Sequence, residues 1–304
     1  MDRVVVVSKP TRLEELVLEH LTLGAAEFAL ASCGQSIAPY QEEDAAYQAA
    51  LTLVRQQIPN DVPVTSVTRE DLPNFLFREN DLIVVCGPDG LFANLAKYIE
   101  SQLVLTVNPD PKTVAGALML FPPHAVGGII AQVRKGSHRT ERLPFVKATI
   151  DDRRVVWGVN DVFIGRKDHI SARYALSFNG ERESQSSSGI IISTGVGATG
   201  WMRSIATMLA GLTHERIPSK LSALPAATSS ELVFVVREPF PSPNTGTRLV
   251  TGRILPGKPL TVSSEMPDGG YIFSDGVVER AVEWKAGSSV VVSVGDRYVK
   301  RIVQ

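Results

Sequence analysis

Apolar runs and helix-like stretches alternate along the first part of the chain. Residues 3–7, 62–67, 82–86 and 103–107 are rich in β-branched and other apolar residues, which is typical of buried strands. Thr11 and Glu14 form a capping-box pair that predicts a helix reaching to about residue 28. Two further helices are predicted, one from apolar positions 47, 50, 51, 54 and 58 on one helical face and one over 92–101. Strands separated by helices pair in parallel, so this part is predicted to be an α/β domain.

From residue 145 the pattern changes to short strand-like runs with turns between them. The runs are 146–150, 155–164, 174–178, 190–192, 232–236, 249–254, 260–262 and 290–294, and only 199–212 is helix-like. This pattern predicts a mainly antiparallel β domain that carries one helix. We therefore divide the chain into residues 1–143 and 144–304, and leave open whether the final strands return to the first domain. The polar, basic stretch 134–142 is interpreted as the linker, with contact to nucleotide phosphates as the alternative.

Composition narrows the functional classes. The 304 residues are 44% hydrophobic and 21% charged, as in ordinary globular proteins. The 31 basic and 32 acidic residues leave a formal net charge of -1, which argues against nucleic acid as a partner. The two cysteines favour a reducing compartment, and no apolar stretch has the length of a signal-peptide core or a transmembrane helix. We therefore expect a cytoplasmic protein with no membrane partner and, because the five histidines are scattered, no metal site.

The loop of residues 86–94, CGPDGLFAN, joins a predicted strand to a predicted helix. Ligands of open α/β sheets bind beyond the carboxyl ends of the strands, where Gly87 and Gly90 let the backbone approach them. Asp89 would then meet a phosphate-bearing substrate with its carboxylate. By itself, however, Gly-Pro-Asp-Gly is also an ordinary tight turn.

Three further loops combine small and polar residues. A glycine-rich loop after residue 192 carries Thr194, Gly197, Thr199 and Gly200, followed by Trp201, and its hydroxyl and N–H groups suit a ligand. It is not a P-loop, because no Gly-Lys-Ser/Thr follows. The pair Asn160-Asp161 interrupts an apolar run, and a buried polar pair must find partners such as sugar hydroxyls. Residues 274–276, Ser-Asp-Gly, are predicted as a hairpin turn, and each of these loops is also compatible with a purely structural role.

Taken together and in this order, the loops resemble the motifs of the NAD kinase family. That family has a Gly-Gly-Asp-Gly-Thr loop, an asparagine after the next strand, an Asn-Glu pair, a Thr-Gly-rich loop and a late Asp-Gly. This chain has residues 87–91 (Gly-Pro-Asp-Gly-Leu), Asn108, Asn160-Asp161, residues 193–201 and Asp275-Gly276 at matching places. The segments Asn-x-Asp-Pro at 108–111, Ser-Ser-Gly at 187–189 and 160–165 are similar in detail to the mitochondrial type. The resemblance covers roughly residues 80 to 280.

The resemblance implies a Rossmann-like N-terminal α/β domain, a β-rich C-terminal domain and an active site between them. It implies an enzyme that transfers a phosphoryl group from ATP, brought with Mg²⁺, to the 2′-hydroxyl of NAD to give NADP, with Asp89 as the catalytic base. The remaining positions carried over as dinucleotide- or phosphate-binding are Gly87, Gly90, Asn108, Asp110, Asn160, Asp161, Thr194, Gly197, Thr199, Gly200, Trp201 and Asp275. A homodimer or higher homo-oligomer is a further expectation from the family.

Two residues depart from the family pattern on the phosphate side. Pro88 replaces the second glycine of the first motif and has no N–H, and Leu91 replaces its threonine and has no hydroxyl. An alternative is therefore a catalytically weak or silent NAD- or NADP-binding protein of the same fold. A kinase for another alcohol, such as a sugar or lipid, is a third interpretation. The sequence distinguishes neither the phosphoryl donor nor NAD from NADH.

Overall fold

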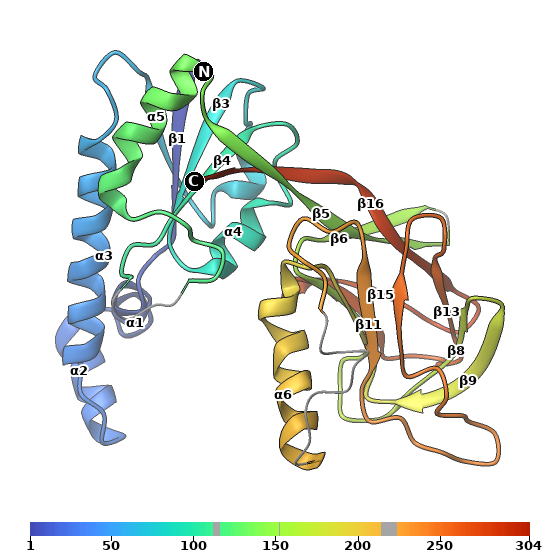
Figure 1. The fold of residues 1–304 in the computed structure, drawn as a ribbon. Coiled ribbons are helices and arrows are strands. Elements are labelled where there is room, and N and C mark those ends of the chain that lie inside the picture. The colour runs from blue at the N-terminus through green and yellow to red at the C-terminus, as the bar shows by residue number, and fades with distance from the viewer. Residues whose placement is uncertain (112–115, 152, 214–223) are drawn as a thin grey trace. The chain divides into compact units, whose positions relative to one another are not determined.

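The computed structural model describes residues 1–111, 116–151, 153–213 and 224–304 (Figure 1). The chain divides into two compact units, one made of Met1–Glu141 with Val299–Gln304 and the other of Arg142–Tyr298. The first unit is of the α/β class and the second is rich in β structure, as the sequence predicts. Each unit has its own hydrophobic core, so each is described by itself.

The first unit is built on a parallel sheet. Strands β1 (Arg3–Ser8), β2 (Val64–Thr68), β3 (Asp81–Cys86) and β4 (Leu103–Val107) lie in the order β2-β1-β3-β4. The last part of β16 (Ser289–Val303) adds to this sheet, because Lys300 and Arg301 pair in parallel with the start of β4. The chain therefore returns to the first unit at its end, an alternative that the sequence left open.

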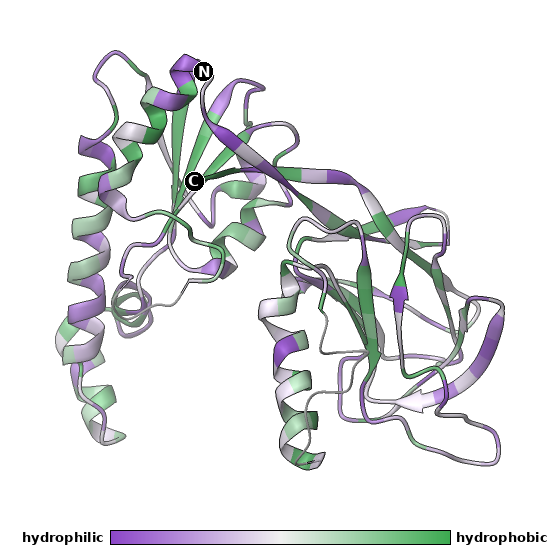
Figure 2. Ribbon diagram, in the orientation of Figure 1, coloured by the Kyte–Doolittle hydropathy of each residue, from purple (hydrophilic) through white to green (hydrophobic). Residues whose placement is uncertain are grey.

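Helices cover both faces of this sheet. The helices are α1 (Arg12–His20), α2 (Leu23–Ser32), α3 (Ala38–Gln56), α4 (Asp89–Leu95) and α5 (Val126–Lys135). Buried residues of α3 and α5 pack together with alternate residues of the strands, such as Val4 and Val6. Figure 1 shows α4 on the opposite side of the sheet from α3. Strands β1, β3 and β4 are buried on both faces and are drawn as hydrophobic in Figure 2, which explains why their sequences are continuous apolar runs.

Two helix predictions for this unit need correction, and one helix was not predicted. The single helix expected from Thr11 to about residue 28 is two helices, because Leu21 adopts a left-handed conformation (φ 67°) and Thr22 caps the second helix through Ala25 N–H. Helix α4 begins at Asp89 and ends at Leu95, three residues before the predicted start and well before the predicted end. Helix α5 was not predicted, since its two glycines are poor helix formers and packing has to stabilise it.

The second unit consists of two packed sheets and one helix. One sheet has the order β12 (Thr251–Ile254), β11 (Leu232–Val236), β10 (Ile190–Ser193), β7 (Asp161–Arg166), β14 (Gly270–Ser274) and β15 (Val277–Glu283). The other has the order β16, β13 (Leu260–Ser264), β8 (Ala172–Phe178) and β9 (Glu181–Ser187), with β5 (Arg139–Ile150) beside β16 and β6 (Arg154–Gly158) beside β5. Their facing residues form the larger core. Helix α6 (Trp201–Thr213) packs on the outer face of the first of these sheets.

Three further expectations differ from the structure. The stretch 134–142 contains the boundary between the two units, after Glu141, but it is not an irregular linker, because it contains the end of α5 and the start of β5. The predicted strand 155–164 is two strands, β6 and β7, with a turn at Val159 and Asn160. Strand β9 is polar along its length and was missed, since hydrophobic alternation is weak there. Among the described helices, none is long and apolar enough to cross a membrane.

Candidate functional site

Asp89 lies at the carboxyl end of β3, as the first residue of α4. Its two carboxylate oxygens accept hydrogen bonds from the backbone N–H groups of Leu118 and Ala117, both at 3.0 Å. Each carboxylate oxygen has more than one acceptor position, so both oxygens keep capacity for another donor. The backbone bonds orient the carboxylate, and the remaining acceptor positions suit it to receive a proton from an alcohol.

Of the two residues that follow Asp89, Leu91 faces the protein interior and Gly90 faces solvent. Leu91 is buried (2% exposed), and a Cβ added to Gly87 would lie 2.8 Å from Leu91 Cδ2. Leu91 therefore fills the interior next to Gly87, and its placement does not support the expectation that a lost hydroxyl there removes a phosphate contact. Gly90 is exposed, and a Cβ added to it would meet no atom within 4 Å. The packing of the chain itself does not require glycine at this position.

Asn108 and Asp110 follow the end of β4, the strand next to β3. The Asn108 side chain is 6% exposed, and its Oδ1 accepts the backbone N–H of Asp110 at 3.1 Å. Its own N–H donates to the carbonyl oxygen of Phe121 at 2.8 Å. The amide of Asn108 thus shapes the turn that presents Asp110.

A cavity of about 250 Å³ lies next to this loop, within the first unit. Its lining comes from the segments after β1, β3 and β4 and from α3: Lys9, Pro10, Thr11, Arg12, Glu43, Tyr47, Gly87, Pro88, Pro109 and Asp110. The Tyr47 hydroxyl accepts the N–H of Lys9 at 3.1 Å and donates to the carbonyl oxygen of Cys86 at 2.7 Å. Burial raises the pKa of the Tyr47 hydroxyl, which keeps it protonated for this bond.

Cys86 ends β3 and is buried. Burial raises the pKa of its thiol to about 12, so the sulfur is protonated at neutral pH. A protonated, enclosed thiol is a poor nucleophile. Cys86 is accordingly a small apolar core residue, as the sequence indicates.

In the second unit, the turn at Asn160 is held by Asp275. The carboxylate of Asp275 accepts the backbone N–H groups of Val159 (3.3 Å), Asn160 (2.8 Å) and Asp161 (3.3 Å). The N–H of Asp275 donates in return to the carbonyl oxygen of Asp161 at 3.1 Å. Strand β14 pairs with β7 with Ser274 opposite Val162, which places the two turns side by side. Asp275 therefore contacts the protein backbone where the resemblance implied a contact with the dinucleotide.

Thr194 holds the same turn from the other side. Its hydroxyl donates to the carbonyl oxygens of Val159 (2.5 Å) and Asn160 (3.2 Å) and accepts the N–H groups of Val196 and Gly197. A Cβ on Gly197 would lie 2.2 Å from the carbonyl oxygen of Asn160, so only glycine allows this close approach. Both residues are thus needed for the shape of the turn.

The side-chain oxygen of Asn160 is a buried polar atom that the turn leaves unsatisfied. Asn160 Oδ1 is buried and has no hydrogen-bond partner among the described residues. A buried carbonyl oxygen without a donor is costly, and a ligand N–H or O–H would satisfy it. Asp161 beside it is 7% exposed. The carboxamide of Asn160 is therefore the part of this site that points to a ligand.

The remaining positions lie at the start of α6. The Thr199 hydroxyl donates to the carbonyl oxygen of Val196 at 3.2 Å, and Gly200 is the last residue before the helix. The Trp201 ring stacks on Phe163 (centroids 5.8 Å apart, planes at 16°) and lies under the guanidinium of Arg237. Trp201 also lines a largely apolar cavity of about 600 Å³ between α6, β11 and β12.

Apart from Thr199, Gly200 and Trp201 at the start of α6, the sequence-predicted residues form two groups. Gly87, Asp89, Gly90, Asn108 and Asp110 follow neighbouring strands of the first unit, and Asn160, Asp161, Thr194, Gly197 and Asp275 surround one turn of the second. Sequence reasoning missed the residues of the first-unit cavity outside the motifs: Lys9, Arg12, Glu43 and Tyr47. The sequence feature that could have identified this cavity is the position of Lys9, which directly follows a buried strand. The carboxyl ends of parallel strands meet at one edge of the sheet, where ligands of such sheets bind. No three His, Cys, Asp or Glu residues form a metal-binding group in the part of the chain that the structure describes.

Comparison with known proteins agrees with the motifs. No family model matches the chain. The NAD kinase of Saccharolobus islandicus strain M.14.25 is 25% identical over 228 residues, which are 73% of this chain and 79% of that protein, and strain M.16.27 gives the same values. The fold is similar to that of yeast NADH kinase complexed with NADH (TM-score 0.59, 14% identity, 99% of this chain and 83% of that one). It is also similar to an NAD kinase from Archaeoglobus fulgidus in complex with ATP (TM-score 0.60, 16% identity, 99% and 93%). The NAD kinase-like fold and the resemblance to this family are confirmed, and the likeness to its mitochondrial type stays a prediction.

Proposed function

We propose that this chain, which shares its fold and a long sequence match with NAD kinases, transfers a phosphoryl group from ATP to the 2′-hydroxyl of NAD. The observation that carries the proposal is the buried, unpartnered Oδ1 of Asn160 at a family motif. Its backbone is held on one side by Asp275 and on the other by Thr194. The adenosine part of NAD has amino and hydroxyl groups that would donate a hydrogen bond to Asn160 Oδ1.

Asp89 is the proposed base of the reaction. As the bond between the 2′-oxygen and the γ-phosphorus of ATP forms, the hydroxyl proton moves to an Asp89 oxygen and the bond to the ADP leaving group breaks. The backbone N–H groups of Ala117 and Leu118 hold the carboxylate in one orientation. Phosphoryl transfer otherwise depends on positioning and on neutralising phosphate charge, which Mg²⁺ entering with ATP supplies in part. Exposed Gly90 would let the backbone approach the substrates.

One observation favours a second candidate function. Pro88 lines the first-unit cavity and has no N–H to offer a phosphate. A protein that binds NAD or NADP with little or no transfer would fit this change. The cytoplasmic location and the homo-oligomeric state remain predictions.

Incubation of the pure protein with ATP, Mg²⁺ and NAD, followed by detection of NADP, tests the transfer. Asp89→Asn should lower turnover by roughly 10²–10⁴-fold with nearly unchanged NAD affinity. Asp61→Asn is the matched control, because Asp61 is an exposed carboxylate of the same unit paired with Arg134. Wild-type turnover in Asp89→Asn would remove Asp89 from the mechanism.

Binding is measured separately by calorimetric titration with NAD. Asn160→Ala should weaken NAD binding by about 1–3 kcal/mol, because a hydrogen bond to the buried oxygen is lost. NAD binding without NADP formation would favour the second candidate. No binding of NAD, or wild-type affinity in Asn160→Ala, would contradict the role of the Asn160 turn.

A further inference from the structure

Arg301 is a buried charged residue to which the steps above assign no role. It is 5% exposed and lies near the end of β16, where it pairs in parallel with Val104 of β4. Its neighbour Ile302 packs in the core with α3 and α5. Successive side chains of a strand point to opposite faces, so Arg301 points to the other face of this sheet. A charged side chain that is buried there has to be held by polar partners.

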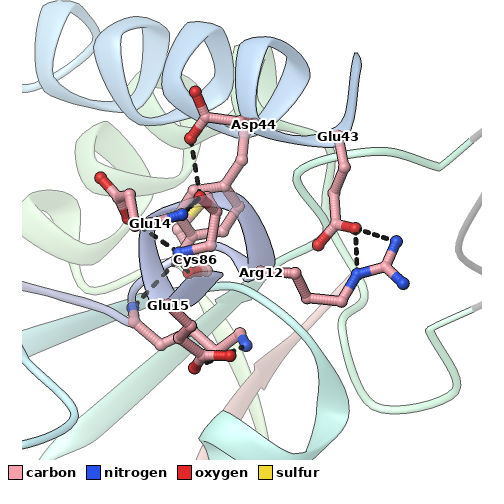
Figure 3. A network of polar contacts seen from close by, with 9 residues as sticks. Arg12, Glu14, Glu15, Glu43, Asp44 and Cys86 are labelled. Atoms are coloured by element: carbon pink, nitrogen blue, oxygen red, sulfur yellow. Dashed lines mark hydrogen bonds and ion pairs between the residues drawn. The ribbon is translucent and has the colours of Figure 1, made fainter. Parts of the chain in front are cut away.

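Two partners hold the guanidinium of Arg301. Its Nε donates to Glu141 Oε1 at 2.7 Å, and Nη2 lies 2.5 Å from the same oxygen. Its Nη1 donates to the backbone carbonyl oxygen of Leu118 at 3.0 Å, in a buried contact. The pair of Arg12 with Glu43 in Figure 3 differs, because its side chains are 55% and 38% exposed, and pairs this exposed contribute little to stability. Burial makes the loss of either partner of Arg301 costly, so the Leu118 backbone is held in place relative to the guanidinium.

Leu118 is also one of the two residues that hold the proposed base. Its N–H and that of Ala117 donate to the two carboxylate oxygens of Asp89, both at 3.0 Å. Residues 116–120 lie outside helices and strands, so individual contacts rather than a ladder of backbone hydrogen bonds position them. The bond from Arg301 to the Leu118 carbonyl oxygen therefore anchors the segment that orients the Asp89 carboxylate.

We propose that Arg301 is a positioning residue for phosphoryl transfer, because it fixes the Leu118 backbone that orients the carboxylate of Asp89. The inference rests on the proposed function, since it concerns the base of the same reaction. A misplacement of about 1 Å can slow a reaction by about a hundredfold. The Thr106 hydroxyl accepts the Leu120 N–H at 3.2 Å, and this bond still holds the segment when Arg301 is changed. The turnover of an Arg301 variant should therefore fall by a smaller factor, of about ten.

The test uses the full chain and compares Arg301→Lys with Arg3→Lys as the matched control. Lysine keeps the positive charge but lacks the planar guanidinium that binds two partners at once. Arg3 forms a similar ion pair with Asp81 in the same unit, and Asp81 begins the strand whose other end leads to Asp89. Arg301→Lys should lower kcat about tenfold with the KM for NAD unchanged, because the base is displaced and the Asn160 turn is not. Arg3→Lys should keep the wild-type kcat.

A combination with Asp89→Asn separates positioning of the base from a general loss of structure. If Arg301 acts through Asp89, adding Arg301→Lys to Asp89→Asn should lower kcat no further than about twofold. Amide hydrogen exchange reports on the segment without the reaction. Exchange at Ala117 and Leu118 should be about tenfold faster in Arg301→Lys and unchanged in Arg3→Lys, because only the first variant removes an anchor of the segment.

The outcomes separate this inference from the proposed function. If the wild type forms NADP, an unchanged kcat in Arg301→Lys, an equal loss in Arg3→Lys, or a full further loss in the double variant would overturn the inference. If the wild type forms no NADP, the proposed function fails and amide exchange alone decides. Faster exchange confined to residues 116–121 in Arg301→Lys then supports Arg301 as the anchor of the Asp89 segment, and unchanged exchange overturns it. Should Arg301→Lys fail to fold, Glu141→Gln takes its place with the same expected results, because it removes the charge that holds the guanidinium.

Discussion

Asp275 offers a direct test of whether a motif residue binds ligand or shapes the protein. Its carboxylate accepts three backbone N–H groups, at 2.8 Å from Asn160 and at 3.3 Å from Val159 and Asp161. A hydrogen bond to a charged group contributes about 1.5–3 kcal/mol, and the two longer bonds contribute less than the short one. The three bonds share one acceptor group and are not additive. We expect Asp275→Ala to lower the free energy of unfolding by about 3 kcal/mol.

In Asp275→Ala, strain in the backbone adds to the loss of the carboxylate. Matched variants at the same position separate these two effects. Asp275 has φ 52°, a left-handed conformation that alanine tolerates less well than aspartate or asparagine. Asp275→Gly removes the carboxylate without the strain, and Asp275→Asn keeps the shape and one acceptor oxygen but loses the charge. We expect the loss of stability to be largest for alanine, smaller for glycine and smallest for asparagine.

Urea denaturation and calorimetric titration with NAD measure the two consequences of the change. Because the carboxylate holds the Asn160 turn, stability and NAD affinity should fall together across the three variants. Wild-type stability in all three, with loss of NAD affinity alone, would refute the reasoning. Asp275 would then act as a direct ligand of the dinucleotide, as the family resemblance implied.

The remaining predictions concern the first unit. Gly90→Ala should raise the thermal unfolding midpoint, because alanine favours the helix by about 0.5–1 kcal/mol. The same substitution should slow phosphoryl transfer, because the added methyl group keeps the substrates from the backbone. An unchanged rate would show that no substrate approaches this backbone. Pro88→Gly should raise kinase activity and tighten ATP binding by restoring a backbone N–H. A slower Pro88→Gly variant would show that the loop works in its own geometry. Leu91→Thr should only lower the free energy of unfolding, by about 1–3 kcal/mol, because it buries a hydroxyl. Burial alone would raise the pKa of Asp81, but the hydrogen bonds from Arg3 and from the Arg78 N–H, together with the positive charges of these two residues, outweigh burial and keep that pKa below its ordinary value. This stabilisation is therefore complete above about pH 4 and is lost as pH falls through the lowered pKa. Asp81→Asn should therefore lower stability at neutral pH by about 3 kcal/mol and flatten the acid side of a denaturation-against-pH curve; an unchanged acid limb would exclude the pair as its cause.

Local patterns predict elements whose burial is uniform along their length. Strands β1, β3 and β4 are covered on both faces, so their sequences are continuous apolar runs, and α3 shows its buried stripe at helical spacing. Hydrophobic patterns do not predict elements that depend on packing or pairing with distant parts of the chain. Helix α5 holds two glycines and is stabilised by the packing of Val126, Ile129 and Ile130, and β9 is polar because its pairing with β8 needs no apolar alternation.

The sequence by itself determined most of the elements, the order of the motifs and the resemblance to NAD kinases. Only the tertiary structure decided what each motif residue touches. Asp275 meets the turn at Asn160 because β14 pairs with β7, a contact between residues 115 positions apart in the chain. Leu91 lies in the interior, and Lys9 lines the same cavity as Gly87, because strand pairing and helix packing place them there. Periodicity reports how deeply a segment is buried, whereas a contact between distant segments depends on strand register, which no local pattern specifies.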